Sequence, residues 1–163
     1  WNVSEGFSNT LKWFSIGGIR WDTSNSYESQ PGVAMGLINV TNNWTTTKRE
    51  DIFITTKIGP TALLGYNDTL DQVQAFLELF NTTYADLILF HWPSANNTAT
   101  FKSSDPYCDA SPKNKQYSPS LCRQSTWRAM ELVYQRGQAR AIGVSNFEKQ
   151  HLMDIFNLNS LIP

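Results

Sequence analysis

Long apolar runs, an excess of charge and internal repeats are all missing from this sequence. No apolar run approaches the ~18 residues of a membrane-spanning helix, so we expect no membrane span. Acidic and basic side chains nearly balance, with a net charge of -1 in 163 residues, and such a surface is not expected to bind nucleic acid. The chain opens on Trp1 without a basic-then-apolar leader, so we expect any signal peptide either to have been removed already or not to be included in this sequence. What remains is ordinary globular composition, long enough for one domain with a core of its own.

Cysteine is scarce too, and the only pair, Cys108 and Cys122, lies at the ends of a polar insertion. A bridge would close a loop of ~15 residues, which contributes about 3 kcal/mol in the loop-entropy model. The alternative is two unrelated free thiols. Sequons of the type Asn-x-Ser/Thr favour the bridge, because the sequence holds six where about two or three are expected from composition. These candidate N-glycosylation sites are Asn2, Asn39, Asn43, Asn67, Asn81 and Asn96.

Bridge and sequons together indicate an oxidising compartment. We therefore expect the protein to be secreted or to lie in the lumen of the secretory pathway. A cytoplasmic location is the alternative.

The run Asp86–Pro93 is typical of a strand buried on both faces, as in a parallel sheet covered by helices. Pro93 has no N–H for a sheet ladder, so the strand should end before it, with His91 where the strand emerges. Three other short apolar runs also deliver a polar group at their ends. They are Ile19–Asp22, Asp51–Lys57 and Arg140–Val144, the last followed by Ser145 and Asn146. Parallel α/β folds build their active sites at that edge.

Helical patterns separate these runs, which predicts right-handed crossovers and a parallel sheet. The segment Thr41–Thr47 should be an exposed loop if its sequons are used, and Ser94–Leu121 lacks periodicity, as a stapled or functional loop would. Leu161–Pro163 looks like the approach to a further strand. The predicted helices are Ser4–Phe14, Gly32–Val40, one capped by Asp68 or Thr69 and ending at Phe80, Ser125–Gln135 and Lys149–Phe156.

Five segments in order resemble the aldo-keto reductases, which are (β/α)8 barrels of the TIM type that reduce carbonyls with NADPH. They are Asp22–Tyr27, Phe53–Lys57, Leu89–Pro93, Trp127–Val133 and Gly137–Phe147. The resemblance covers nearly all of residues 1–163 except the insertion at 94–121. It implies an α/β fold with about four parallel strands and their helices, which is part of a barrel.

By this resemblance the four residues Asp22, Tyr27, Lys57 and His91 form a catalytic tetrad. Hydride delivery builds negative charge on the carbonyl oxygen, which an acid must protonate. A free tyrosine has a pKa of about 10, and a nearby ammonium eases the loss of its proton. Lys57 would then assist Tyr27, Asp22 would hold the lysine, and His91 would hydrogen-bond and orient the carbonyl oxygen.

The resemblance also implies NADP(H) as cofactor, with Ser145 and Asn146 on its nicotinamide carboxamide and Trp92 in the pocket of a small-molecule carbonyl substrate. The family binds the cofactor's phosphates in a half that this sequence does not match. We predict no metal site.

Two features depart from the family pattern. Ser29-Gln30 and Val33-Ala34 stand where relatives usually show Asn-Glu and Val-Gly, and the 94–121 insertion, with any glycan on Asn96, could cover the mouth of the site. Four strands cannot close a barrel, which leaves both sheet edges open. Either these residues are part of a longer chain or another subunit covers the half-barrel.

Two functions follow as hypotheses. The first is an NADP(H)-dependent aldo-keto reductase, active as part of a longer chain while the 163 residues alone are inactive. The second is a secreted glycoprotein that keeps the reductase fold as a scaffold or assembly module.

Overall fold

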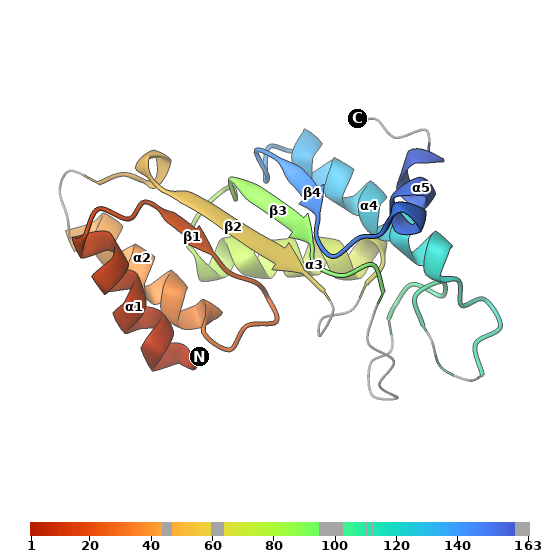
Figure 1. Ribbon diagram of the computed structural model, residues 1–163, viewed down its shortest axis with the longest axis horizontal. Coiled ribbons are helices and arrows are strands. Elements are labelled where there is room, and N and C mark those ends of the chain that lie inside the picture. The colour runs from red at the N-terminus through yellow and green to blue at the C-terminus, as the bar shows by residue number, and fades with distance from the viewer. Residues whose placement is uncertain (44–46, 60–63, 95–102, 110, 112, 159–163) are drawn as a thin grey trace.

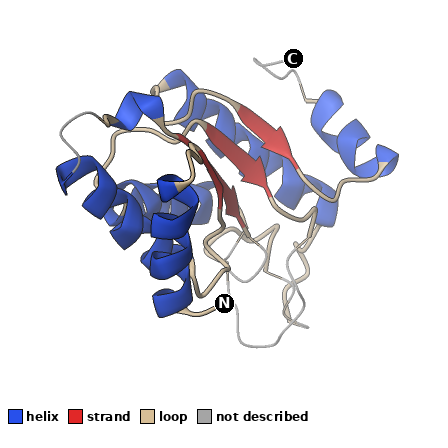
Figure 2. Cartoon of the chain, turned by 60° about the vertical axis from the view of Figure 1, so that its left-hand side comes forward, coloured by secondary structure: helices blue, strands red, loops and turns tan. Residues whose placement is uncertain are grey.

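The fold is a parallel four-stranded sheet whose helices cover one face (Figures 1 and 2). The computed structural model describes residues 1–43, 47–59, 64–94, 103–109, 111 and 113–158. In the view of Figure 1, α3 and α4 lie behind the sheet and no described helix crosses its front, while α1 and α2 lie beside the β1 edge. The elements are α1 Val3–Ser15, β1 Arg20–Asp22, α2 Gln30–Asn43, the 3-10 helix η1 Arg49–Asp51, β2 Phe53–Ile58, α3 Tyr66–Leu79, β3 Leu87–Phe90, α4 Pro119–Gln135, β4 Ile142–Val144 and α5 Lys149–Phe156.

The sheet has the order β1-β2-β3-β4 with all neighbours parallel, as the sequence predicts. Trp21 pairs with Ile54, Lys57 with Leu89, and Leu89 with Gly143, so the four carboxyl ends meet at one edge. Backbone bonds extend the ladder beyond the strands, since His91 N–H donates to the Ile58 carbonyl at 3.0 Å. The expected partial barrel is therefore confirmed as a parallel α/β sheet.

Three predicted boundaries were wrong. The helix α2 runs to Asn43, so part of the segment expected as an exposed loop is helical, and the sequon at Asn39 lies half-buried within it. The helix α3 begins at Tyr66 after Gly65, so neither Asp68 nor Thr69 is its cap. The Asp68 carboxylate instead accepts hydrogen bonds from Ser103 and Ser104. These partners are distant in the sequence, so local residue spacing could not predict them.

The third correction concerns the insertion. The helix α4 begins at Pro119 instead of Ser125, because the Ser118 side chain caps it and proline suits a first helical position. Of the 94–121 insertion, residues 119–121 are therefore helical. Cys122 lies inside α4 and is bonded to Cys108, which confirms the predicted disulfide. Residues 95–102 and 159–163, and with them Asn96 and the expected further strand, lie outside the described residues.

The remaining sequons are found at varied positions. Asn2 is the exposed N-cap of α1 and accepts a hydrogen bond from Glu5 N–H. Asn67 and Asn81 are exposed, and Asn43 ends α2.

Helices α1 and α2 pack backbone to backbone through glycine. A Cβ on Gly32 would lie 1.9 Å from the Val3 carbonyl oxygen, and one on Gly36 would lie 2.7 Å from the Thr10 side chain. No larger residue fits at Gly32 without moving a helix. This packing fixes α1 beside β1.

A buried carboxylate joins the amino ends of the strands. Asp86, whose side chain is 3% exposed, accepts hydrogen bonds from Ile54 N–H and from Arg49, both at 2.9 Å. Arg140 approaches its other oxygen at 3.4 Å, and both guanidinium groups lie 4.1 Å from the Tyr84 ring centroid. This cluster ties β2, β3 and the approach to β4 at the edge opposite the carboxyl ends.

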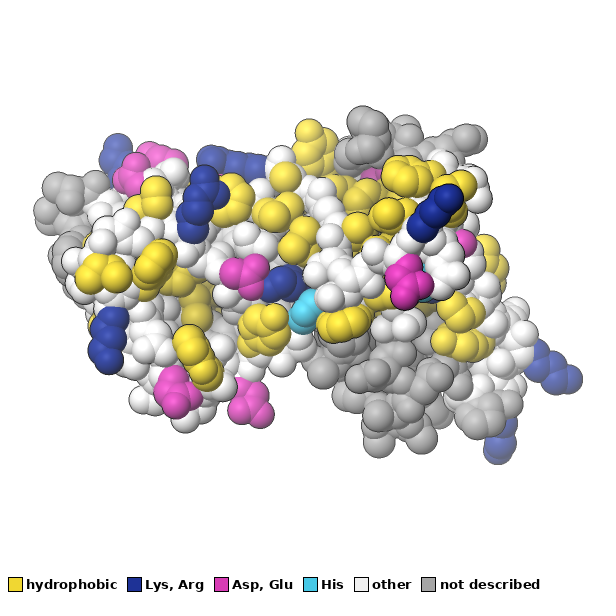
Figure 3. Space-filling model, in the orientation of Figure 1, with side chains coloured by type: hydrophobic (Ala, Val, Ile, Leu, Met, Phe, Trp, Pro, Cys, Tyr) yellow, Lys and Arg dark blue, Asp and Glu magenta, His cyan; other side chains and the backbone are white. Residues whose placement is uncertain are grey.

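The described residues contain no helix long and apolar enough to cross a membrane. Figure 3 shows the open face of the sheet, where acidic, basic and histidine side chains meet near the centre among apolar ones.

Replacing Asp86 by alanine should lower the free energy of unfolding by about 2–4 kcal/mol, because it leaves the Arg49 charge and the Ile54 N–H without their acceptor. Urea denaturation followed by circular dichroism measures the change. Glu50→Ala is the control. Glu50 is exposed, and its one ion pair among the described residues is with the exposed Lys48 at 3.9 Å, so this variant should lose less than about 1 kcal/mol. Equal losses in both variants would contradict the role given to Asp86.

Candidate active site

The structure brings the four tetrad residues together at the carboxyl edge of the sheet. Asp22 ends β1, Lys57 lies in β2, and His91 follows β3 directly. Tyr27 comes from the loop between β1 and α2. Three neighbouring strands and one loop thus supply the four side chains.

Lys57 lies at the centre of this cluster. Its residue is 7% exposed, and its ammonium forms an ion pair with the Asp22 carboxylate and donates to the Thr23 carbonyl at 3.1 Å. A buried ammonium needs such partners to offset its lost hydration. The same nitrogen lies 5.1 Å from the centroid of the Tyr27 ring, within the range of a cation–π contact.

Hydrogen bonds to β2 hold the loop that carries Tyr27. Asn25 N–H donates to the Lys57 carbonyl at 3.1 Å. Gln30, 6% exposed, accepts from Thr56 at 3.1 Å and donates to the Asn25 side chain at 2.9 Å. The sequence marked Gln30 only as a departure from the family pattern. Its role depends on a contact 26 residues away, which no local motif signals.

His91 is buried, with 8% of its surface exposed. Its Nδ1 lies 3.2 Å from the Gly59 carbonyl oxygen, and its ring stands edge-on to Tyr27 with centroids 5.7 Å apart. Burial lowers the pKa of His91 below the usual 6.5; the hydrogen bond with Gly59 opposes this shift, the Lys57 charge adds to it, and the Asp22 charge opposes it. The neutral imidazole is the favoured form near neutral pH.

Ser145 and Asn146 follow β4, on the other side of His91. Ser145 N–H donates to the Phe90 carbonyl at 2.9 Å. Asn146 adopts a left-handed backbone conformation with φ 61°, which asparagine tolerates better than most residues. Its amide nitrogen donates to the His91 carbonyl at 2.8 Å and to the Ser145 hydroxyl oxygen at 3.1 Å. The turn after β4 is therefore tied to the end of β3.

Trp92 is 45% exposed, and its ring centroid lies 6.1 Å from that of His91. Trp92 therefore lies beside the cluster, and its place in a substrate pocket stays a prediction.

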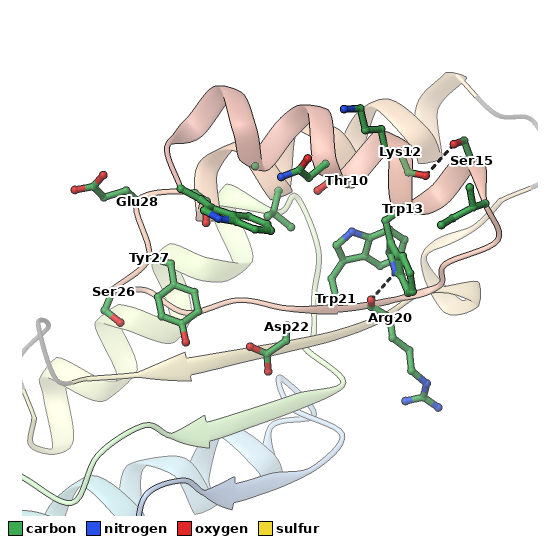
Figure 4. Close-up of a pocket in the computed structure, with 16 residues that line it drawn as sticks. Thr10, Lys12, Trp13, Ser15, Arg20, Trp21, Asp22, Ser26, Tyr27 and Glu28 are labelled. Carbon is green, nitrogen blue, oxygen red and sulfur yellow. Dashed lines mark hydrogen bonds between the residues drawn. The ribbon is translucent and has the colours of Figure 1, made fainter.

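A cavity of about 1180 Å³ lies between α1, β1 and the loop before α2, with Asp22 and Tyr27 in its lining (Figure 4). Trp21 and Asp22 point to opposite sides of β1, and the Tyr27 hydroxyl lies on the Asp22 side. Trp13 closes part of the β1 edge, because its indole N–H donates to the Arg20 carbonyl at 3.0 Å. The buried Trp21 Nε1 has no hydrogen-bond partner among the described residues. Three tryptophans, Trp1 among them, make this space largely apolar.

Nowhere in the described part of the chain do three or more His, Cys, Asp or Glu side chains gather as a metal site would require.

A comparison with protein families matches residues 9–163 to the aldo/keto reductase family. The 9,11-endoperoxide prostaglandin H2 reductase of Trypanosoma cruzi (strain CL Brener) is 29% identical over 166 residues, covering 100% of this chain and 48% of that protein. The glyoxal reductase of Bacillus subtilis (strain 168) is 34% identical over 142 residues, covering 87% of this chain and 40% of that protein.

Solved structures agree. An aldo/keto reductase from Brucella melitensis superposes with a TM-score of 0.74 at 26% identity, covering 100% of this chain and 53% of that one. The Bombyx mori aldo-keto reductase in complex with NADP superposes with a TM-score of 0.75 at 25% identity, covering 99% and 47%. The chain thus spans about half the length of these relatives.

The lowered pKa of His91 should make stability depend on pH. The unfolded chain binds a proton at this histidine more readily than the folded protein, so the free energy of unfolding should fall as pH drops below about 6.5 and level off below the folded pKa. Denaturant titrations across this range measure the fall. His91→Gln should remove this part of it, whereas the control His151→Gln should keep it. An unchanged pH slope in His91→Gln would contradict the assignment.

Proposed function

This chain belongs to the aldo/keto reductase family, and on that premise we propose that it supplies the proton-donating side of an NADP(H)-dependent carbonyl reductase, with Tyr27 as the donor. The observation that carries the proposal is the ion pair that the buried Lys57 forms with the exposed Asp22, with the Tyr27 ring centroid 5.1 Å from the ammonium. A lysine that served only the stability of the fold would not need to be buried beside a tyrosine at the carboxyl edge of the sheet. The substrate class is a small-molecule aldehyde or ketone.

The chemistry assigned to these residues is protonation of a carbonyl oxygen. NADPH, when bound, supplies the hydride for the carbonyl carbon. As the oxygen gains electron density, Tyr27 gives it the hydroxyl proton. The negative charge left on the tyrosine oxygen is stabilised by Lys57, which Asp22 keeps oriented. The charges are already arranged before the reaction, so little reorganisation is required.

The residues after β4 fit a carboxamide such as that of nicotinamide. The carbonyl oxygen of a carboxamide accepts hydrogen bonds, and its NH2 group donates them, so a site for it must offer both a donor and an acceptor. The Ser145 hydroxyl accepts from Asn146 and keeps its own proton to donate. The Asn146 amide oxygen has no hydrogen-bond partner among the described residues and is left to accept. Ser145 and Asn146 would thus hold this end of NADP(H).

Replacing Tyr27 by phenylalanine should lower the turnover of NADPH with an aldehyde at least about 100-fold, because it removes the acid while leaving the ring. The assay follows NADPH absorbance with the protein at its native length. Tyr134→Phe is the control, since Tyr134 is an exposed residue of α4 and should keep full activity. Full activity in Tyr27→Phe would refute the role of Tyr27 as proton donor.

A second candidate function is a secreted glycoprotein that uses the reductase fold as a scaffold. The observations that favour it are the Cys108–Cys122 disulfide and the exposed sequons at Asn2, Asn67 and Asn81. It places the protein in the secretory pathway. The edge strands β1 and β4 would then be covered by another subunit or by the rest of a longer chain.

The mass of the native polypeptide after enzymatic removal of N-glycans tests this candidate. We expect mass to be lost on deglycosylation. A remaining mass near 18.5 kDa favours the scaffold, and a mass about twice that leaves room for a complete barrel. No loss of mass, with both cysteines free, would remove the scaffold's support.

A further inference from the structure

Two carbonyl groups that accept side-chain hydrogen bonds lie on either side of Trp92 in the segment after β3. The side-chain amide of Asn146 donates to the His91 carbonyl at 2.8 Å. Nη1 of Arg123, in α4, donates to the Pro93 carbonyl at 3.1 Å. Because proline has no N–H, this carbonyl is the only backbone group through which Pro93 can be held. The backbone at Trp92 is thus fixed from the β4 side and from α4.

Arg123 lies near the start of α4 and is 8% exposed. Its Nε and Nη2 donate to one oxygen of the Asp154 carboxylate, at 2.8 and 2.5 Å, which leaves Nη1 for the Pro93 carbonyl. The Ser120 hydroxyl donates to the other carboxylate oxygen at 2.7 Å. Since Asp154 belongs to α5, the guanidinium of Arg123 joins α4, α5 and the segment after β3.

The Asp154 carboxylate is ionised near neutral pH. Burial opposes this state, but the hydrogen bonds from Ser120 and Arg123, followed by the charges of Arg123 and His151, bring the pKa of Asp154 below its usual 3.8. The ion pair with Arg123 therefore persists at neutral pH and holds the guanidinium in one orientation.

The contribution of this ion pair is better described as orientation than as stability. Desolvation offsets much of the attraction between two charges that are removed from water, so a buried pair is weak evidence for a stabilising role. A guanidinium is planar, however, and its five N–H groups point in fixed directions. When Asp154 holds one edge of Arg123, the direction of Nη1 is determined, and that direction leads to the Pro93 carbonyl.

We propose that Arg123 is a positioning residue that holds Trp92 in place and, through the Trp92 indole, supports binding of the carbonyl substrate. The second part rests on the proposed function, in which Trp92 belongs to the substrate pocket. The Trp92 residue is 45% exposed, so packing alone holds its indole weakly and the backbone beside it must set its position. Loss of the bond to the Pro93 carbonyl frees that backbone, and the indole then occupies several positions.

Fluorine NMR of protein labelled with 5-fluorotryptophan tests the first part without turnover. A Trp92→Phe sample identifies the Trp92 signal, and a Trp21→Phe sample identifies that of Trp21, which lies in β1 at the far edge of the sheet from β4. We expect Arg123→Met to shift or broaden the Trp92 signal and to leave the Trp21 signal in place. An unchanged Trp92 signal would overturn the proposal.

Two further variants separate the bond to the carbonyl from the ion pair and from a general loosening of the fold. Arg123→Lys keeps a positive charge beside Asp154, but a single nitrogen cannot replace three that donate in two directions, so we expect it to disturb the Trp92 signal as well. Arg140→Met removes an arginine that pairs with Asp86 at the amino edge, and should leave the signal unchanged. A normal signal in Arg123→Lys, or an equal change in Arg140→Met, would refute the role of Arg123.

Steady-state kinetics with NADPH and an aldehyde, on the protein at its native length, test the second part. We expect Arg123→Lys to raise KM for the aldehyde about 10-fold and to change kcat less than about 2-fold, because it alters binding of the substrate and not the proton donor. An unchanged KM, or a fall in kcat alone, would refute the effect on substrate binding. An inactive parent protein would count against the proposed function and leave the fluorine result standing.

Discussion

The buried carboxylate of Asp86 is the interaction on which the register of the sheet depends. Asp86 directly precedes β3 and accepts the N–H of Ile54 near the start of β2. If the two strands slid past one another, this hydrogen bond would break and the carboxylate would stay buried without it. A slip of one residue would turn every side chain of a strand to the opposite face. Lys57 would then no longer lie beside Asp22 at the far edge. The amino edge thus determines the geometry of the carboxyl edge.

The cluster at the carboxyl edge holds a buried ammonium, that of Lys57, beside the more exposed side chains of Asp22 and Tyr27. Lys57 is held by Asp22 and by the Thr23 carbonyl, and its field reaches both the Tyr27 ring and His91. The same charge disfavours protonation of the His91 imidazole. Lys57 is therefore a close neighbour of both Tyr27 and His91.

Much of the fold could be predicted from local patterns. The strands are short apolar runs, and the polar group that ends each one is visible in the sequence, which is why Lys57 and His91 were found. The bounds of α5 matched as well, and the disulfide was confirmed. The position of Tyr27 followed from the family motif rather than from periodicity.

Contacts between segments that are distant in the sequence could not be predicted. Gln30 supports the loop of Tyr27 through Thr56, and Asp68 binds Ser103 instead of capping α3. Gly65, with φ 118°, is the N-cap that precedes α3 and supplies no side-chain hydrogen bond. The Gly59 carbonyl that lies beside His91 is a backbone group, so no residue type in the sequence could predict this contact. Such contacts form only when the tertiary fold brings the segments together.

The Cys108–Cys122 bond has a consequence for the integrity of the chain. It spans 14 residues, and on either side of that span lie β1–β3 and β4 with α5. A protease that cuts between the two cysteines would therefore leave both parts covalently joined. The nicked molecule would migrate as one species until a reductant separated it into two, and the strands would stay within reach of one another in the meantime.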